Sequence, residues 1–255
     1  MSVLEANHVK KVYKTRLGGE GVTALKDVHF SVEPGEFVAI MGESGSGKTT
    51  LLNILASLDT PTAGKVLING KDYSDLKDGE RAIFRRNNLG FIFQDFNLLD
   101  NFTIEDNIKL PLVLAGEDYK TMDEKVLPLA KELGIESLLK KYPYEVSGGQ
   151  KQRTAVARAL ITNPHILLAD EPTGALDSKA ATNLMHQLRD IHKSGQTILM
   201  VTHSNVAASY ADRVMFIRDG EVFHQIYRGN LKRTEMLDKI CDTVTVVMRG
   251  GEDNE

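Results

Sequence analysis

The sequence of 255 residues predicts an α/β fold, with a mainly parallel β-sheet flanked by helices. Three observations support this class. Short apolar runs alternate along the chain with segments of helical periodicity. Several of these runs are continuously apolar, which is typical of strands buried on both faces of a parallel sheet. One of them leads through a glycine-rich loop directly into a helix, which is the order expected of a strand–loop–helix unit.

The first half of the chain supplies the strands that frame this unit. Phe37–Met41 is the first buried strand, and the helix after the glycine-rich loop runs from Thr49 to about Leu58. Lys65–Asn69 and Leu89–Phe93 have the composition of further strands. The sheet therefore begins before the loop and continues after its helix.

The middle of the chain, from about Asp95 to Ile161, lacks convincing strands and is predicted to be a helical insertion. Thr121–Leu133 has apolar residues at helical spacing. Gly148–Ile161 is a second helix, and Ser147 is placed to cap its first turn.

The last third returns to alternating strands and helices. Ile166–Ala169 and Thr197–Val201 are continuous apolar strands, separated by a helix from about Lys179 to Lys193. Val214–Ile217 and Val222–Ile226 then flank an Asp-Gly pair, which predicts a β-hairpin.

Beyond residue 228 we expect a C-terminal extension. It contains a short helix that starts after Gly229, with Leu237, Ile240, Cys241 and Val244 on one face. The acidic end, residues 252–255, is expected to be disordered.

Charge and cysteine content narrow the class of protein. The formal net charge of -4 gives no global basic field, so a nucleic-acid partner is not expected. Cys241 is the single cysteine, which excludes an intramolecular disulfide and fits a reducing cytoplasm. No signal-peptide pattern is present, and the longest apolar runs are too short to cross a bilayer. We therefore expect a soluble cytoplasmic chain that reaches a membrane only through a partner.

The glycine-rich segment after the first buried strand matches the P-loop pattern of glycine, four residues and Gly-Lys-Ser/Thr. Glycines let successive backbone N–H groups point at phosphate oxygens, and the following helix adds its positive end. Lys48 can reach the β- and γ-phosphates, and the Thr49 hydroxyl can bind Mg²⁺. The predicted residues of this nucleoside triphosphate site are Gly42, Ser44, Gly45, Ser46, Gly47, Lys48, Thr49 and Thr50.

Two adjacent carboxylates end the strand that begins at Ile166. Ionised carboxylates beside a core are costly unless a positive group meets them. In P-loop proteins a second buried strand carries an aspartate that supports Mg²⁺, and Asp170 occupies that position. Glu171 can then orient or deprotonate the attacking water. The alternative, a solvated strand end, does not account for the P-loop upstream.

A second anion site is indicated by Ser147-Gly148-Gly149-Gln150-Lys151-Gln152-Arg153. With the preceding Val146, where leucine is more usual, this segment resembles the signature of ATP-binding cassette (ABC) ATPases. The resemblance spans about residues 3 to 226. It implies a P-loop NTPase core with an antiparallel β subdomain and a helical subdomain, and it implies hydrolysis of ATP with Mg²⁺.

The resemblance also assigns roles to single residues. Gln94 is similar to the glutamine that touches Mg²⁺ and the lytic water, and His203 to the histidine that contacts the γ-phosphate. Asp177 ends a loop that resembles the one crossing the dimer interface. Tyr13 is similar to the aromatic residue that stacks on adenine, although a partly buried strand tyrosine remains an alternative.

In this family, two cassettes bind head to tail. The resemblance therefore implies that Ser147, Gly148, Gly149 and Gln150 of one copy close over ATP held by a second copy. It also implies an integral membrane permease as partner, with the chain bound at the cytoplasmic face of the membrane. The apolar residues Phe96, Leu98, Leu99, Phe102 and Ile104 would face the groove for the permease, or would be ordinary core of the helical subdomain.

Within the family, residues 91–112 and the segment from Asp170 to Ser178 resemble the group that serves macrolide export, lipoprotein release and peptide-antibiotic resistance. Ala175, residues 207–210 and the C-terminal extension are most similar to the bacitracin-resistance (Bce-type) branch. Alternatives are a lipoprotein-release or macrolide-efflux ATPase, or a regulatory ATP switch that gates a cell-wall hydrolase. We expect a cassette over residues 1–228, with the helical subdomain at about 95–161, and an extension over 229–255.

Overall fold

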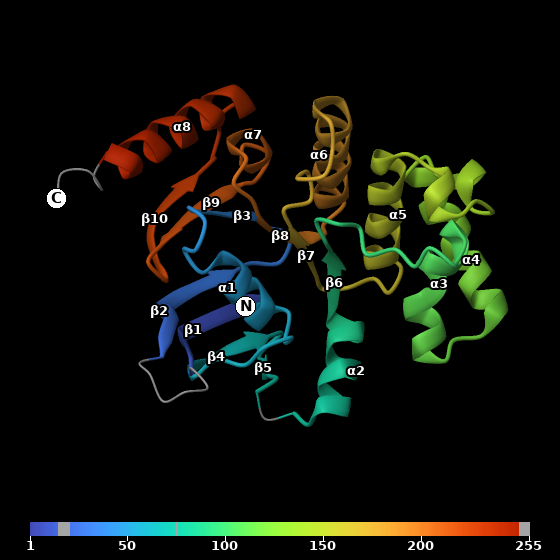
Figure 1. Cartoon of the computed structure of the whole chain (residues 1–255), viewed down its shortest axis with the longest axis horizontal. Coiled ribbons are helices and arrows are strands. Elements are labelled where there is room, and N and C mark those ends of the chain that lie inside the picture. The colour runs from blue at the N-terminus through green and yellow to red at the C-terminus, as the bar shows by residue number, and fades with distance from the viewer. Residues whose placement is uncertain (15–20, 75, 250–255) are drawn as a thin grey trace.

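The computed structural model describes residues 1–14, 21–74 and 76–249. One sheet of ten strands runs through this part of the chain, in the order β5-β4-β1-β2-β10-β9-β3-β8-β7-β6. Figure 1 shows the sheet with one group of helices at the end where β6 lies and α8 near the opposite side. The strands are β1 (Leu4–Tyr13), β2 (Val22–Val32), β3 (Phe37–Met41), β4 (Ala63–Ile68), β5 (Lys71–Asp72), β6 (Leu89–Ile92), β7 (Ile166–Asp170), β8 (Thr197–Val201), β9 (Arg213–Arg218) and β10 (Glu221–Tyr227).

Helices connect and cover these strands. The α-helices are α1 (Lys48–Leu55), α2 (Asp78–Asn88), α3 (Ile104–Ala115), α4 (Tyr119–Glu132), α5 (Gly148–Leu160), α6 (Ser178–Lys193), α7 (Asn205–Ala208) and α8 (Arg233–Arg249). Two single-turn 3₁₀ helices, η1 (Glu136–Leu138) and η2 (Pro143–Glu145), join α4 to α5. None of the described helices has the length and apolar character needed to span a membrane.

The centre of the sheet is parallel, as the sequence predicts. β3 pairs in parallel with β8 and β9, and β7 pairs in parallel with β6 and β8. Every residue of β3 and β8 is buried. Their continuous apolar composition follows from this position, because side chains on both faces of the central strands are covered.

The amino-terminal side of the sheet is antiparallel. β1 pairs with β2 and β4, and β4 pairs with β5, all in antiparallel register. β9 and β10 form the predicted hairpin, with Asp219 and Gly220 at positive φ in its turn. Positive φ at both central residues is the geometry that an Asp-Gly pair favours.

Helices alone occupy the described chain between β6 and β7. α5 begins after Ser147, whose hydroxyl accepts from the Gln150 N–H while the Gln150 side chain accepts from the Ser147 N–H. This reciprocal capping confirms the N-cap that the sequence predicts. α3 packs against α5, and both lie beside the β6 edge (Figure 1).

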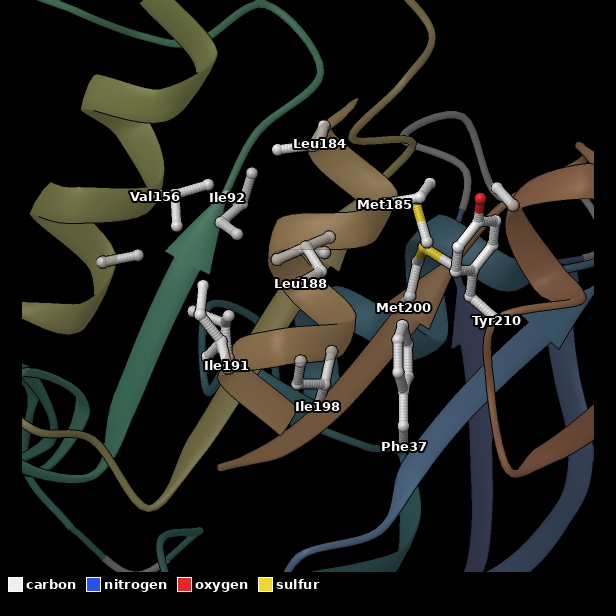
Figure 2. Close-up of a cluster of buried hydrophobic side chains, with 14 of the residues drawn as sticks. Phe37, Ile92, Val156, Leu184, Met185, Leu188, Ile191, Ile198, Met200 and Tyr210 are labelled. Carbon is white, nitrogen blue, oxygen red and sulfur yellow. The ribbon is translucent and has the colours of Figure 1, made fainter. Parts of the chain in front are cut away.

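Apolar side chains fill both faces of the sheet, in two clusters. Figure 2 shows one face, where Leu188 and Ile191 of α6 lie over Ile198 and Phe37. The cluster extends to α5 through Val156. This packing holds the carboxyl ends of β3, β6, β7 and β8 at one edge, and ligands of open α/β sheets bind at that edge.

The C-terminal helix differs from the prediction of a short helix, because α8 extends from Arg233 to Arg249. Met236 and Ile240 are fully buried, and Val244 packs on the same core cluster. Cys241, which the sequence places on one face with Leu237, Ile240 and Val244, is exposed. The actual buried positions are four residues apart, which keeps them on one narrow stripe of the helix and turns Cys241 outward. The acidic end at 252–255 lies outside the described residues.

Candidate functional site

The loop between β3 and α1 has a backbone that only glycine can adopt at key positions. Gly45 and Gly47 have φ values of 82 and 101. A Cβ atom on Gly47 would lie 2.5 Å from the Ala24 carbonyl oxygen, and one on Gly42 would lie 2.2 Å from the Ile217 carbonyl oxygen. The glycines of the P-loop pattern are therefore required both by left-handed geometry and by close approach of neighbouring backbone.

A cavity of about 370 Å³ lies against this loop. It is lined by Ala24, Gly42, Ser44, Gly45, Gly47, Lys48, Thr49, Thr50, Glu171 and His203. The structure thus brings the predicted phosphate loop together with residues that follow β7 and β8. Ala24 is the lining residue that sequence reasoning missed. It comes from β2, and no motif marks it.

Lys48 is held at the base of this cavity by the loop itself. Its Nζ donates to the carbonyl oxygens of Gly42 at 2.8 Å and Glu43 at 2.7 Å. Burial lowers the pKa of Lys48, and the charges of Glu171, Asp170 and Glu43 oppose that shift. The predicted residue Ser46 lies behind the loop, where its buried Oγ has no hydrogen-bond partner among the described residues.

Two carboxylates face the lysine from the end of β7. Glu171 has a φ of 44, and its N–H donates to the Val201 carbonyl oxygen at 2.9 Å. Glu171 Oε1 lies 2.8 Å from His203 Nδ1, and Oε2 accepts from the His203 N–H at 3.3 Å. The Glu171 side chain is only 14% exposed, whereas that of His203 is 73% exposed. The backbone turn and these contacts fix the direction of the Glu171 carboxylate.

Asp170 is the last residue of β7, and although its charge acts on Lys48, it does not itself line the cavity. Burial raises the pKa of Asp170, the Glu171 charge raises it further, and Lys48 opposes the shift. A divalent cation would relieve the repulsion between the two acids. No group of three or more histidine, cysteine, aspartate or glutamate residues in the described ranges can hold a metal alone. Mg²⁺ bound together with a nucleotide commonly uses one or two carboxylates and substrate phosphates as ligands.

The remaining predicted residues near the nucleotide lie outside the cavity. Gln94 follows β6 on an exposed loop, and its Nε2 would be 3.1 Å from a Cβ on Gly174. The Tyr13 hydroxyl donates to Asp59 at 2.9 Å, and Lys11 lies 4.8 Å from the centre of its ring. Tyr13 is 42% exposed, which leaves a ring available to stack.

The signature residues border a different cavity, of about 420 Å³. Its lining contains Ser147, Gly148, Gly149, Gln150 and Asp177, together with Arg153, Ala175, Leu176, Lys179, Ala180, Asn183 and Leu184. Asp177 caps α6 by accepting from the Ala180 N–H at 2.8 Å. The two cavities share no lining residue, so one chain keeps its two predicted anion sites apart.

Two cationic residues that line this second cavity, Arg153 and Lys179, were not predicted as site residues. Arg153 lies one helical turn after Gly149, and Lys179 lies in the first turn of α6. The spacing of four residues between Gly149 and Arg153 is a signal that helix periodicity could have supplied, whereas no such spacing marks Lys179.

A third cavity, of about 580 Å³, is a groove between α2, β6, α3 and α5. Its apolar lining includes Phe91, Phe93, Leu110, Pro111 and Leu114. The predicted groove residues Phe96, Leu98, Leu99, Phe102 and Ile104 do not line it, and Ile104 is fully buried in the core. Alternation along β6 turns Leu89 and Phe91 toward the groove, and Phe93 and Asn97 of the following loop also line it.

The strand–loop–helix cradle, the acid-ended strand β7 and the separate signature cavity define a P-loop nucleotide-binding protein of the cassette type. A family model described as "ABC transporter" matches residues 25–174. The chain belongs to the ABC transporter family.

Known proteins similar to this chain support a finer assignment. It is 51% identical to the ABC transporter ATP-binding protein YxdL of Bacillus subtilis, over 100% of this chain and 97% of that protein. It is 49% identical to the bacitracin export ATP-binding protein BceA of Halalkalibacterium halodurans, over 100% of both. A dimeric, post-hydrolysis structure of the ATP-binding cassette MJ0796 with ADP and Pi has a TM-score of 0.80 at 40% identity. It covers 90% of this chain and 99% of that one.

These similarities confirm several predictions from the sequence. The P-loop ABC fold, the ATPase class with ATP and Mg²⁺, and the resemblance to the bacitracin-resistance branch are confirmed.

Proposed function

We propose that this chain is the ATP-hydrolysing subunit of a membrane transporter that protects against bacitracin-like peptide antibiotics. The transporter class follows from the family. The antibiotic is supported by similarity to a bacitracin export protein along the entire chain, including the C-terminal extension.

The residues that line the first cavity, together with the predicted residues Asp170, Gln94 and Tyr13 outside its lining, fit a triphosphate with its metal. The loop amides and Lys48 hold the phosphates, and Thr49, Gln94 and Asp170 hold Mg²⁺. The metal neutralises charge on the phosphate oxygens when it is bound. Glu171 takes a proton from the attacking water, and its contacts with His203 orient the carboxylate for that role. His203 contacts the γ-phosphate, and Tyr13 stacks on adenine.

The separation of the two cavities supports a head-to-tail pair of chains. Ser147, Gly148, Gly149 and Gln150 of one copy cover ATP in the cradle of the other, with Asp177 at the interface. The N-terminus of α5 supplies backbone N–H groups to the phosphates, as helix starts do for anions. Loss of the γ-phosphate removes part of that attraction, so hydrolysis loosens the pair.

The groove between β6 and α3 is the proposed docking site for a cytoplasmic helix of the permease. Its lining combines apolar side chains with Arg85, Arg86 and Arg158 at its edges. Docking there places the chain at the cytoplasmic face of the membrane. We propose the same division of the chain as from the sequence, with a cassette over 1–228, a helical subdomain over 95–161 and an extension over 229–255.

The observation that best supports hydrolysis is the shared cavity of Lys48 and Glu171. Glu171→Gln keeps the shape of the side chain but removes the base. We expect about 10²–10⁴-fold slower phosphate release, retained ATP binding and a stable ATP-dependent dimer by light scattering. Glu132→Gln, at an exposed carboxylate of α4, is the matched control. Undiminished turnover in the Glu171 variant would refute the assignment.

The antibiotic is tested in cells. A strain in which Glu171→Gln replaces the native chain should become sensitive to bacitracin while the control variant stays resistant. Unchanged bacitracin sensitivity, with loss of lipoprotein release or macrolide export, would favour those alternatives. A defect in cell division would favour the regulatory switch.

A further inference from the structure

Arg158, near the end of α5, holds the loop that follows β6. Its Nη1 donates to the Asn97 carbonyl oxygen at 2.5 Å, and its Nη2 donates to the Phe96 carbonyl oxygen at 2.8 Å. Burial lowers the pKa of the Arg158 guanidinium. A long cationic side chain is thus drawn out of water to bind two successive backbone carbonyls, although ordering it costs conformational entropy.

The two residues that Arg158 holds have an unfavourable backbone. Phe96 and Asn97 have φ values of 62 and 48. Left-handed conformation is uncommon for residues other than glycine and is energetically unfavourable for each. Such a pair persists only where its surroundings hold it, and the Arg158 fork supplies two of those contacts.

The same loop carries Gln94 toward the turn that follows Glu171. The Gln94 side chain lies against Gly174, and the Gly174 N–H donates to the Glu171 carbonyl oxygen at 2.9 Å. Gln152, fully buried on α5, donates from Nε2 to the Pro172 carbonyl oxygen at 2.8 Å. One helix therefore ties together both loops that approach the phosphate cavity.

Arg158 also faces the groove on its other side. Arg158, Asn97 and Phe93 all line that cavity. A displacement of the groove wall therefore acts directly on the arginine fork, and through it on the backbone three residues from Gln94.

We propose that Arg158 is a positioning residue that sets Gln94 for hydrolysis by fixing the left-handed turn at Phe96 and Asn97. This inference rests on the proposed function, because it assumes that Gln94 acts on Mg²⁺ and water at the cradle. It assigns to the C-terminal turn of the signature helix a role separate from its N-terminal contact with nucleotide.

The test compares Arg158→Met, Arg158→Lys and Gln94→Ala in the full chain, by steady-state phosphate release. Arg158→Met should lower kcat at least about tenfold, since small misplacements of a positioned group have large effects on rate. KM for ATP should stay within about twofold, because Lys48 and the glycine loop are untouched, and the Mg²⁺ concentration for half-maximal rate should rise. Arg158→Lys, which can still donate to one carbonyl, should recover part of kcat.

A double-mutant cycle separates positioning from general structural support. In the Gln94→Ala background, Arg158→Met should change kcat by less than about twofold, because the residue that it positions is already gone. Arg81→Met is the matched control. Arg81 on α2 donates from Nη2 to the Leu76 carbonyl oxygen at 3.1 Å, does not line the groove and lies away from the Gln94 loop, so basal kcat should be unchanged.

Two results would overturn the inference. The first is an unchanged kcat in Arg158→Met. The second is a fold-loss of kcat from Arg158→Met that is as large in the Gln94→Ala background as in the wild-type background. If instead the wild-type chain shows no ATP turnover, the proposed function fails and the inference fails with it. A normal wild-type rate combined with either of the first two results removes only the role of Arg158.

Discussion

Asp212 immediately precedes β9 and contacts both α6 and the first residue of β3. These contacts lie at the amino end of β3, opposite the end that leads into the nucleotide cavity. Its Oδ1 accepts from Arg189 Nη1 at 2.7 Å, and its Oδ2 lies 2.9 Å from His192 Nε2. Oδ2 also accepts from the Phe37 N–H at 3.2 Å. Burial alone would raise the pKa of Asp212, but the hydrogen bonds from His192, Arg189 and Phe37 hold it well below its usual range.

Replacement of Asp212 by asparagine keeps the shape and removes the charge. Hydrogen bonds to charged groups contribute about 1.5–3 kcal/mol each, and two charge-assisted contacts are weakened. Because the carboxylate is 33% exposed, water screens part of this, and we expect a net loss of about 2–3 kcal/mol. For a chain of this size, that corresponds to a fall in Tm of about 5–10 °C.

The pH dependence of the free energy of unfolding gives a second, independent measure of the Asp212 contribution. A carboxyl group whose pKa is depressed by folding stabilises the protein fully above its unfolded pKa of about 3.9, and this contribution is lost as the pH falls toward the folded pKa. The difference in free energy of unfolding between wild type and Asp212→Asn should therefore contain the full contribution of the carboxylate at pH 5.5. It should be smaller by about 0.7 kcal/mol at pH 3.5.

Thermal unfolding followed by circular dichroism at these pH values measures the difference. Asp190→Asn is the matched control, because Asp190 lies on α6 between Arg189 and His192, has a 72% exposed side chain and pairs only with Lys193 among the described residues. It should change Tm by less than about 2 °C. A Tm for Asp212→Asn equal to that of the control, or a difference that grows as the pH falls, would refute the reasoning.

Two further substitutions test the cradle and the helical region. Lys48→Ala should weaken ATP binding by about tenfold or more in calorimetric titration, because the charge that meets the phosphates is lost, whereas Lys193→Ala should bind normally. An unchanged affinity would count against the cradle. Lys109→Met should lower stability by about 3–5 kcal/mol, because Lys109 is 5% exposed and pairs with Glu105 and Asp123. Lys140→Met removes only an 86% exposed partner of Glu105 and should have little effect on Tm, so equal effects of the two would contradict this account.

Elements with strong local signals were predicted closely from the sequence. β3 and β8 begin and end where the apolar runs do, and Ser147 caps α5 as its residue type indicates. The reason is physical, because fully buried parallel strands and capped helices depend mainly on their own residues. The P-loop belongs to the same group, since its glycines are required by the backbone that they form.

Elements that depend on distant partners were not predicted. β1 contains shifts in register against β2, and His8 within it has a φ of 51, so the alternation of a strand is interrupted. α2 is mostly polar, and Lys77 occupies its N-cap position, so its usual start signal is missing. The Arg158 fork is of the same kind, because its acceptors are about sixty residues away and the loop backbone decides where they lie.

The sharpest test of the account is complementation between two defective chains. Lys48→Ala disables the cradle, and Ser147→Arg blocks the signature cavity, so each variant alone should be inactive. In a head-to-tail dimer of the two, one site has an intact cradle facing an intact signature, and the other has neither. Mixing equal amounts should therefore restore ATP hydrolysis to about a quarter of the wild-type rate, since half of the dimers are mixed and each has one complete site. A mixture as inactive as its components would contradict the claim that two chains complete each site.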